Sequence, residues 1–148
     1  MHSTAYHFDY SIVATDISSR MLKTAKQAVY PISQVDEISL AVKQRYFLKS
    51  KSLADQKVRV IKKLRDRVLP AYLNFMDGTY LLDSQFDIIF LRNTLIYFEH
   101  SIQQEVLRKV LEKLKIGGYL FVGHSESLIN MTLPLKSIAP SVYFKINN

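Results

Sequence analysis

The feature that most constrains the fold is a strand-like run, an amphipathic helix and a second strand-like run, in that order, in the C-terminal half. Residues Phe86–Leu91 (FDIIFL) form a continuous apolar segment, which is typical of a buried strand. The segment Ser101–Lys115 repeats apolar residues at helical spacing, and Tyr119–Val122 is apolar again. Leu135–Ile138 and Val142–Ile146 then favour a terminal hairpin. This alternation predicts an α/β sandwich with a mostly parallel sheet.

The limits of the Ser101–Lys115 helix have their own sequence signals. Ser101 and Gln104 match the spacing of a capping box, in which side chains satisfy the first free N–H groups of a helix. Gly117 is placed to end the helix. The buried face is expected to contain Ile102, Val106, Val110 and Leu114.

A similar strand and helix begin the chain. Residues Tyr10–Thr15 (YSIVAT) form a short apolar run that ends at Asp16, as expected for a buried strand. Ser18 or Ser19 can cap the helix after it, because a serine hydroxyl accepts from N–H groups of the first turn. Pro31 is expected to end this helix.

The segments between these two halves are shorter. Residues Val35–Leu40 suit a short helix or a loop, and Arg45–Lys49 and Lys57–Ile61 suit strands of a small antiparallel excursion outside the main sheet. The apolar segment Val68–Phe75 contains Pro70, which favours an edge strand or a bulge because proline lacks an N–H group.

Composition excludes several classes of protein. With 148 residues, 48% of them hydrophobic and 22% charged, the chain suits one globular domain. It has no cysteine for disulfides, no apolar run long enough for membrane insertion and no signal-peptide pattern at its start. A cytoplasmic protein is therefore expected.

The net charge of +7 is concentrated in one stretch. Residues Lys43–Arg67 contain ten basic and two acidic residues, a local charge of +8. Such a patch indicates an acidic partner, although a solvated lysine-rich surface explains it equally well. Nucleic acid is not favoured, because no nucleic-acid-binding motif accompanies the charge.

Polar residues follow the predicted strands, where ligands of parallel sheets bind. These residues are Asp16, Asn74, Arg92, Asn93 and the segment 123–126 (GHSE). Asp16 can accept from the two hydroxyls of a ribose, or it can cap the next helix. Asn93 can bridge a ligand or cap a turn, and Asn74 suits a turn.

Other catalytic classes fit poorly. The segment 123–127 (GHSES) approximates the nucleophile elbow of serine hydrolases, but it lacks the last glycine and no histidine follows His124. The four histidines show no metal-ligand spacing, and no glycine-rich phosphate loop is present.

Several motifs, in order, resemble those of the CheR-type chemotaxis-receptor methyltransferases, which are protein-glutamate O-methyltransferases. Residues 14–18 (ATDIS) resemble the motif of their second strand, and Arg45-Tyr46-Phe47 resembles the entry to their inserted β-subdomain. Residues 86–98 (FDIIFLRNTLIYF) are similar to FDxIFCRNVMIYF, and residues 117–127 (GGYLFVGHSES) to GGYLFxGHSES. The similarity extends over about residues 9–145.

The resemblance implies the fold, the cofactor and the site. Residues 1–148 would form an α/β, Rossmann-like S-adenosylmethionine-dependent methyltransferase domain that lacks its first strand, with a small antiparallel β-subdomain inserted at about residues 43–67. Asp16 would bind the ribose of S-adenosylmethionine. Asn74 and Phe75 would contact the adenine side, Arg92 and Asn93 would close the pocket, and Tyr97 would lie near the transferred methyl group and the incoming glutamate.

The chain departs from this family at its start, which falls just before the second strand. An N-terminal helical domain, the first strand, its cofactor loop and an N-terminal arginine are missing, so we expect a truncated member that is itself inactive or weakly active. The expected function is methylation of glutamate side chains on chemoreceptors, with a receptor cytoplasmic domain or acidic receptor tail as partner. The alternative is a non-catalytic CheR-like module that binds such a partner through its basic β-subdomain.

The missing first strand would lie between Tyr10–Thr15 and Phe86–Leu91. Unpaired strand edges recruit other chains, so we expect this gap to be closed. The two strands could pair directly, a segment near His2–Phe8 could fill the gap, or a second copy could donate a strand. We favour a homodimer.

Overall fold

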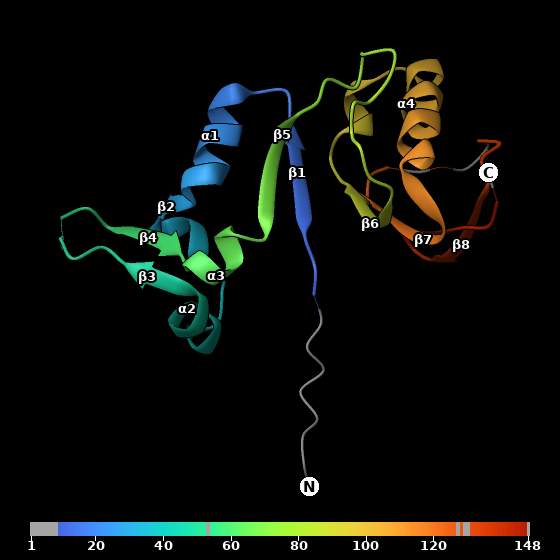
Figure 1. The fold of residues 1–148 in the computed structure, drawn as a ribbon. Helices are drawn as coiled ribbons and strands as arrows, with labels where there is room; N and C mark the ends of the chain where they lie inside the picture. The colour runs from blue at the N-terminus through green and yellow to red at the C-terminus, as the bar shows by residue number, and fades with distance from the viewer. Residues whose placement is uncertain (1–8, 53, 127, 129–130, 148) are drawn as a thin grey trace, which may run out of the picture. The chain divides into compact units, whose positions relative to one another are not determined.

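The computed structural model describes residues 9–52, 54–126, 128 and 131–147. The chain divides into two compact units, Met1–Asn74 and Phe75–Asn148, and each is described by itself. Figure 1 shows the elements of both units in chain order.

The first unit contains a pair of parallel strands. Strand β1 (Ile12–Asp16) pairs with β5 (Val68–Tyr72) in a register that runs from Ile12 opposite Val68 to Asp16 opposite Tyr72. Helix α1 (Ser19–Gln27) follows β1 and packs against β5. Both predicted strands are therefore present, and their carboxyl ends lie at the same edge.

The ends of α1 follow from Ser18 and Ala28. The Ser18 hydroxyl accepts from the Met21 N–H at 3.4 Å, which makes Ser18 the N-cap. The helix ends where Ala28 adopts the left-handed conformation, with φ 51°. Pro31 was therefore wrongly predicted to end the helix; it lies in strand β2 (Val29–Pro31).

A small antiparallel sheet completes the first unit. Strand β4 (Lys57–Val60) lies between β2 and β3 (Phe47–Lys49), in the order β2-β4-β3. The expected small antiparallel sheet is confirmed, but it also includes β2, which lies outside the expected residues 43–67. The helical segments of this region are η1 (Ile32–Val35), α2 (Leu40–Tyr46) and α3 (Lys62–Arg65).

One expectation for this region needs correction. Arg45 and Tyr46 were expected in a strand, but they form the last turn of α2. The segment Val35–Leu40, expected as a short helix or a loop, mainly joins η1 to α2. The strand begins at Phe47, where the pairing with β4 starts opposite Val60. Pairing between strands thus decides the boundary more than local residue preference does.

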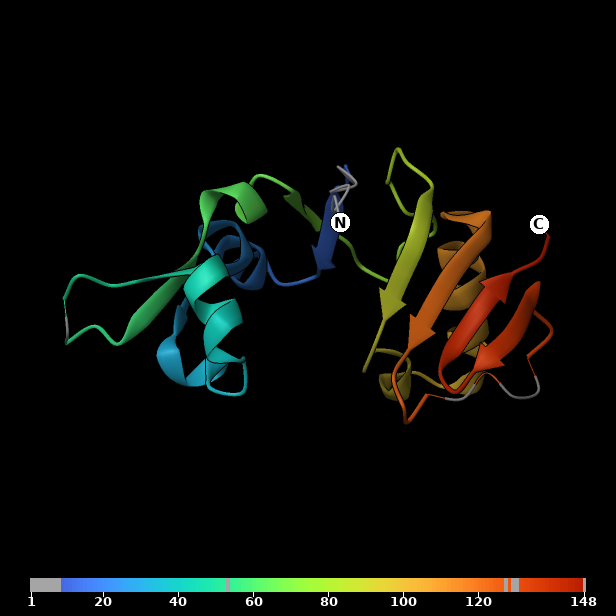
Figure 2. The same ribbon diagram turned by 90° about the horizontal axis from the view of Figure 1, so that it is seen from below.

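The second unit is a four-stranded sheet covered by a helix. Strand β6 (Phe86–Leu91) runs parallel to β7 (Leu114–Val122), and the sheet continues through β9 (Val142–Lys145) to β8 (Leu135–Ala139). Figure 2 shows the four strands side by side with α4 (His100–Glu112) over one face. The predicted strand–helix–strand unit and terminal hairpin are confirmed.

The core of the second unit lies between α4 and the sheet. Val106, Leu107, Leu114 and Leu120 are at most 1% exposed. The predicted apolar face is confirmed within α4, where Val106 and Val110 are buried and Ile102 is half-buried. Leu114, predicted on the same face, is buried as the first residue of β7. The opposite sheet face keeps exposed apolar residues, namely Ile88, Phe90 and Tyr119.

The predicted caps of α4 are wrong. The N-cap is Glu99, without a side-chain hydrogen bond, so Ser101 and Gln104 do not form the capping box. The helix ends at Glu112, with Lys113 as its C-cap. The Lys145 ammonium donates to the carbonyls of Leu111, in the last turn, at 2.8 Å and of Leu114, the first residue of β7, at 2.9 Å. The first of these bonds reaches a carbonyl of the helix end, where carbonyl groups lack helical partners.

The glycine predicted as the helix stop lies in a strand. Gly117, with φ 80°, and Gly118 are both part of β7. A Cβ at Gly118 would come within 2.7 Å of Leu114 Cδ1 and 3.0 Å of the Asp87 carbonyl oxygen, so glycine permits the close approach of β6 and β7. In the described part of the chain, no helix is long and apolar enough to cross a membrane.

Candidate functional site

Two of the predicted site residues lie together at the carboxyl edge of the β1–β5 pair. Asp16 is the last residue of β1, and Asn74 follows the end of β5 by two residues. The Leu73 N–H donates to the Asp16 carbonyl at 3.2 Å, which ties the two chain segments together beyond the last paired residues. Both side chains are half-buried. This edge has the position at which parallel sheets bind ligands.

The Asp16 carboxylate closes the turn between β1 and α1. Its Oδ1 accepts from the Ser18 N–H at 2.8 Å. Asp16 is therefore not the helix N-cap, which is the role that sequence reasoning had left open. A carboxylate has two oxygens with about four acceptor positions, so this single bond is compatible with accepting from ribose hydroxyls.

Two further predicted residues follow β6 in the second unit. Arg92 and Asn93 come directly after Leu91, which is paired with Val122 at the end of β7. Both side chains are exposed, and Asn93 has a left-handed backbone with φ 55°. Asparagine tolerates this conformation better than most residues. The loop thus presents a guanidinium and an amide at the carboxyl edge of the β6–β7 pair.

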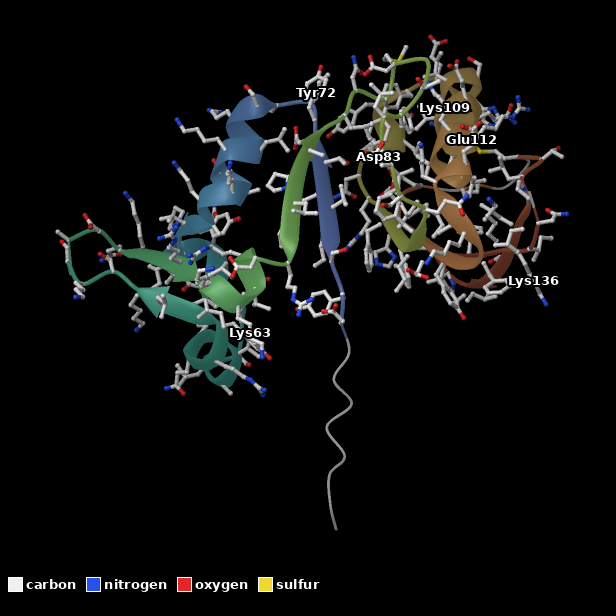
Figure 3. The ribbon with its side chains drawn as sticks, viewed as in Figure 1. Lys63, Tyr72, Asp83, Lys109, Glu112 and Lys136 are labelled. Atoms are coloured by element: carbon white, nitrogen blue, oxygen red, sulfur yellow. The ribbon has the colours of Figure 1, made fainter. Side chains whose placement is uncertain are left out.

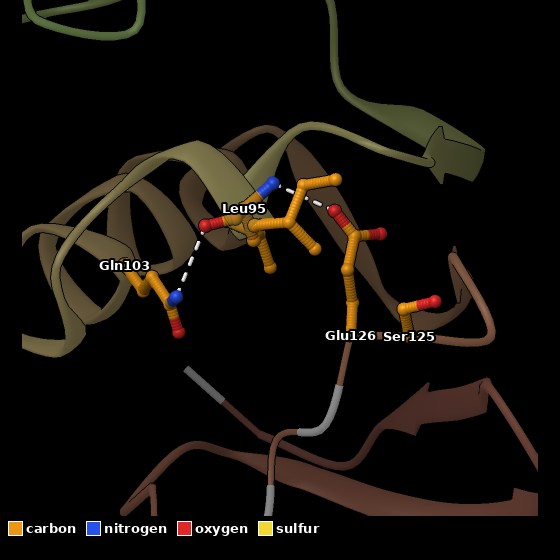
Figure 4. Close-up of a pocket in the computed structure, with 5 residues that line it drawn as sticks. Leu95, Gln103, Ser125 and Glu126 are labelled. Atoms are coloured by element: carbon orange, nitrogen blue, oxygen red, sulfur yellow. Dashed lines mark hydrogen bonds between the residues drawn. The ribbon is translucent and has the colours of Figure 1, made fainter.

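This loop is held by a buried carboxylate from beyond β7. Glu126 is 6% exposed, and its Oε1 accepts from the N–H groups of Thr94 and Leu95, each at 2.6 Å. Its Oε2 accepts from Gly123 at 2.6 Å and Asn93 at 3.1 Å. Figure 4 shows Glu126 beside Leu95. Sequence reasoning placed Glu126 among the strand-end residues but assigned it no role.

Gly123 allows this arrangement because it has no side chain. A Cβ there would lie 2.6 Å from Glu126 Oε2, 2.9 Å from Asn93 Oδ1 and 3.1 Å from Asn93 N. Real Cβ atoms essentially never approach other atoms at 2.6 Å, so a side chain at this position would force the Glu126 carboxylate or Asn93 to move. The Glu126 N–H donates to the Gly123 carbonyl at 3.0 Å, which closes a turn. A turn in place of a strand-to-helix elbow also argues against the serine hydrolase alternative.

A small pocket lies next to Glu126 (Figure 4). It is lined by Leu95, Ile96, Gln103, Ser125 and Glu126. The Gln103 amide donates to the carbonyls of Leu95 at 3.0 Å and Phe98 at 2.9 Å, so α4 also fixes the start and end of this loop segment.

Tyr97, the predicted catalytic residue, lies at the end of the same loop. It is the last residue of the short helix η2 (Leu95–Tyr97), which begins at a Glu126-bound amide. The Tyr97 side chain is 79% exposed. The second unit therefore brings Arg92, Asn93 and Tyr97 together in one loop.

Phe75 is fixed by a different contact, which sequence reasoning missed. Its carbonyl accepts from the Tyr80 hydroxyl at 3.1 Å and from the Lys109 ammonium at 3.0 Å. Lys109 projects from α4 (Figure 3), also donates to the Asp77 carbonyl at 2.7 Å, and lies 5.2 Å from the centroid of the Tyr80 ring. Burial, with smaller contributions from Glu105 and Asp77, raises the pKa of Tyr80. Tyr80 therefore remains a neutral hydrogen-bond donor.

Part of the basic stretch Lys43–Arg67 is engaged in contacts within the first unit. Several of its side chains bind within the first unit: Lys43 to the Asp36 carbonyl, Arg59 to the Gln27 carbonyl, Arg65 to the Val60 carbonyl, Lys62 to Asp66 and Arg67 to Asp9. Lys49, Lys57 and Lys63 are exposed, on β3, β4 and α3. Within the described residues, no cluster of His, Asp or Glu side chains could hold a metal ion.

Comparison with protein families identifies the chain. Residues 1–144 match the family described as CheR methyltransferase, SAM binding domain. The chain belongs to this family. The expected resemblance and the expected α/β class are thereby confirmed, and S-adenosylmethionine is the cofactor of the matched domain.

Curated relatives agree with this assignment. Chemotaxis protein methyltransferase 2 of Pseudomonas aeruginosa is 32% identical over 132 residues, which cover 89% of this chain and 47% of that protein. The chemotaxis protein methyltransferase of Salmonella typhimurium is 32% identical over 90% of this chain and 46% of its own. That of Borreliella burgdorferi is 33% identical over 98% and 50%. The chain thus spans about half the length of these relatives.

Proposed function

We propose that this chain forms the cofactor-binding part of a protein methyltransferase that acts on glutamate side chains of chemoreceptors. The observation that carries the proposal is the position of the polar residues at the carboxyl ends of parallel strands. Asp16 and Asn74 occupy this edge in the first unit, and Arg92 and Asn93 in the second. The names of the relatives support a role in chemotaxis.

The chemistry of these residues fits S-adenosylmethionine. The Asp16 carboxylate suits two neighbouring ribose hydroxyls, because it offers two acceptor oxygens. Asn74 and Phe75 offer an amide and an aromatic face to the adenine. Arg92 and Asn93 would close the site with groups that donate and accept. Bound S-adenosylmethionine supplies a methyl group that its sulfonium already activates.

The protein then has little covalent chemistry to perform. A glutamate carboxylate is ionised at neutral pH and acts as the nucleophile without a general base. Orientation and the exclusion of water from the reacting pair can provide most of the acceleration. Tyr97 is exposed, and we assign it the role of positioning the incoming glutamate with its hydroxyl.

We place the chain in the cytoplasm with the receptor signalling domain as its partner. The exposed lysines Lys49, Lys57 and Lys63 provide a positive surface for an acidic receptor segment. The same surface supports a second candidate function, that of a non-catalytic CheR-like module that holds a receptor. The two functions differ in whether receptor binding is accompanied by cofactor binding and methyl transfer.

Calorimetric titration with S-adenosylhomocysteine tests the cofactor site. We expect the wild-type chain to bind, and Asp16→Asn to weaken binding by about 10- to 100-fold, because a charge-assisted hydrogen bond is lost. The exposed Asp83 gives a matched control, and Asp83→Asn should bind like the wild type. Equal binding by Asp16→Asn would contradict the assignment of Asp16.

A second measurement separates the two functions. Labelled S-adenosylmethionine is incubated with the chain and a chemoreceptor fragment that contains methylatable glutamates. Labelled receptor supports the enzyme, with less label for Tyr97→Phe. Receptor binding without any binding of S-adenosylhomocysteine at millimolar concentration would favour the non-catalytic module.

A further inference from the structure

The four hydrogen bonds to Glu126 are concentrated on the loop that carries the proposed cofactor residues. Three of them come from consecutive residues, Asn93, Thr94 and Leu95. Successive N–H groups directed at one anion form a nest, which complements a negative charge. The fourth comes from Gly123, at the end of the neighbouring strand. One carboxylate therefore ties the end of β6 to the end of β7.

These bonds determine the conformation of Asn93. Its left-handed backbone (φ 55°) is uncommon for a residue other than glycine, although asparagine tolerates it, and the surrounding contacts help to maintain it. The N–H groups of Asn93 and of the next residue are both bound to Glu126, on opposite sides of the Asn93 α-carbon. The direction in which the Asn93 side chain leaves the backbone is thereby fixed.

The arrangement reaches beyond the packing of the core. The core residues Leu95, Leu107 and Leu120 already pack the loop and helix against the sheet. A buried carboxylate has a high desolvation cost, which the four N–H donors offset only in this geometry. Asn93 and Arg92, in contrast, are exposed. The carboxylate thus binds not only the core residue Leu95 but also the exposed Asn93, which is not part of the core.

We propose that Glu126 is a positioning residue, which holds Asn93 in the orientation that the cofactor requires. This inference rests on the proposed function, because it assigns Asn93 to the cofactor. Glu126 itself makes no contact with the reacting groups in this assignment. It acts through the backbone of Asn93 and of Thr94.

The variant Glu126→Gln tests the role with little change in size. A glutamine keeps one acceptor oxygen, but its NH₂ group would face two N–H donors, so half of the nest is lost. Glu112→Gln on the exposed face of α4 removes the same charge as a control (Figure 3). We expect S-adenosylhomocysteine binding to weaken about 10- to 100-fold for Glu126→Gln and to stay unchanged for Glu112→Gln.

A double-mutant cycle with Asn93→Ala separates positioning from general loss of structure. If Glu126 acts through Asn93, Glu126→Gln should weaken binding less than about 3-fold once the Asn93 side chain is absent. Circular dichroism at the titration temperature confirms that each variant is folded. Should Glu126→Gln fail to fold, Glu126→Asp takes its place, since it keeps the charge but shortens the reach.

The possible results are distinct. Full-strength binding by folded Glu126→Gln would overturn the positioning role while leaving the cofactor site intact. Equal losses in the wild-type and Asn93→Ala backgrounds would also overturn it, because Glu126 would then act independently of Asn93. No binding by the wild-type chain would remove the proposed cofactor site, and the positioning role with it.

Discussion

Gly123 is the residue whose side-chain space is most tightly restricted around the β6–β7 edge. The positions that a Cβ would take are already filled by the Glu126 carboxylate and by the side chain and backbone of Asn93. A methyl group added at this position would therefore disturb the conformation of the proposed cofactor loop. Gly123 is therefore a site where stability and ligand binding should change together.

We predict that Gly123→Ala destabilises the second unit by about 1–3 kcal/mol, because a packed site must move to admit the methyl group. Urea unfolding measures the change. Gly78→Ala is the matched control, since nothing lies within 4 Å of a Cβ there, and it should change stability by less than about 0.5 kcal/mol or increase it slightly. A Gly123→Ala variant as stable as Gly78→Ala would show that the loop has more room than the structure indicates.

At the scale of elements, the apolar runs allowed the main strands and α4 to be predicted from the sequence. FDIIFL became β6, and the apolar stripe of the following helix became the buried face of α4. The ends of the elements were predicted less well. The Lys145 ammonium binds the end of α4 and the start of β7 from 34 and 31 residues away, and no local pattern at Gly117 could reveal these contacts.

The same reason explains what could be predicted of the candidate site. The strand-end positions of Asp16, Arg92 and Asn93 follow from the alternation of strands and helices, so the sequence identified them. The role of Glu126 depends on contacts with residues 31 to 33 positions earlier, and these form only when β6 and β7 pair. The assignment of the six site residues to the cofactor and substrate stays a prediction.

Sequence reasoning also missed the contact between Tyr80 and α4. The titration of the Tyr80 hydroxyl gives a pH-dependent test of this contact. The pKa of Tyr80 in the folded chain lies above its ordinary value of 10.0, chiefly because of burial. Above that value, the unfolded chain loses the phenolic proton while the folded chain keeps it. The unfolded state then binds fewer protons, so the free energy of unfolding falls as pH rises.

We predict that Tyr80→Phe lowers stability at pH 7 by about 1 kcal/mol, through the lost hydrogen bond to the Phe75 carbonyl. Lys109 still donates to that carbonyl, which limits the loss. The variant should also lose less stability than the wild type between about pH 9 and about pH 11 in urea unfolding. Tyr72→Phe, at an exposed tyrosine, is the control (Figure 3). An unchanged alkaline slope in Tyr80→Phe would refute this account.

At the scale of the whole molecule, the uneven charge is the clearest property that both sequence and structure display. The net charge is +7, and the exposed lysines of β3, β4 and α3 lie within one stretch of the first unit. Five other basic side chains of this stretch are engaged in contacts inside the unit. Some of these side chains are still exposed, Lys62 at 77%, so the contacts order part of the basic surface without removing it. The homodimer expected from the sequence stays a prediction.

We predict that an acidic chemoreceptor segment binds this surface with an affinity that falls as salt rises, because exposed charges are screened over about 8–10 Å at ordinary ionic strength. The double variant Lys49→Glu and Lys57→Glu should weaken binding strongly at low salt. Lys23→Glu with Lys136→Glu changes the net charge equally at exposed positions outside the stretch, and should weaken it little. Fluorescence anisotropy of a labelled peptide measures both. Equal effects of the two double variants would mean that the peptide responds to total charge alone, and the basic surface would then be ordinary solvated surface.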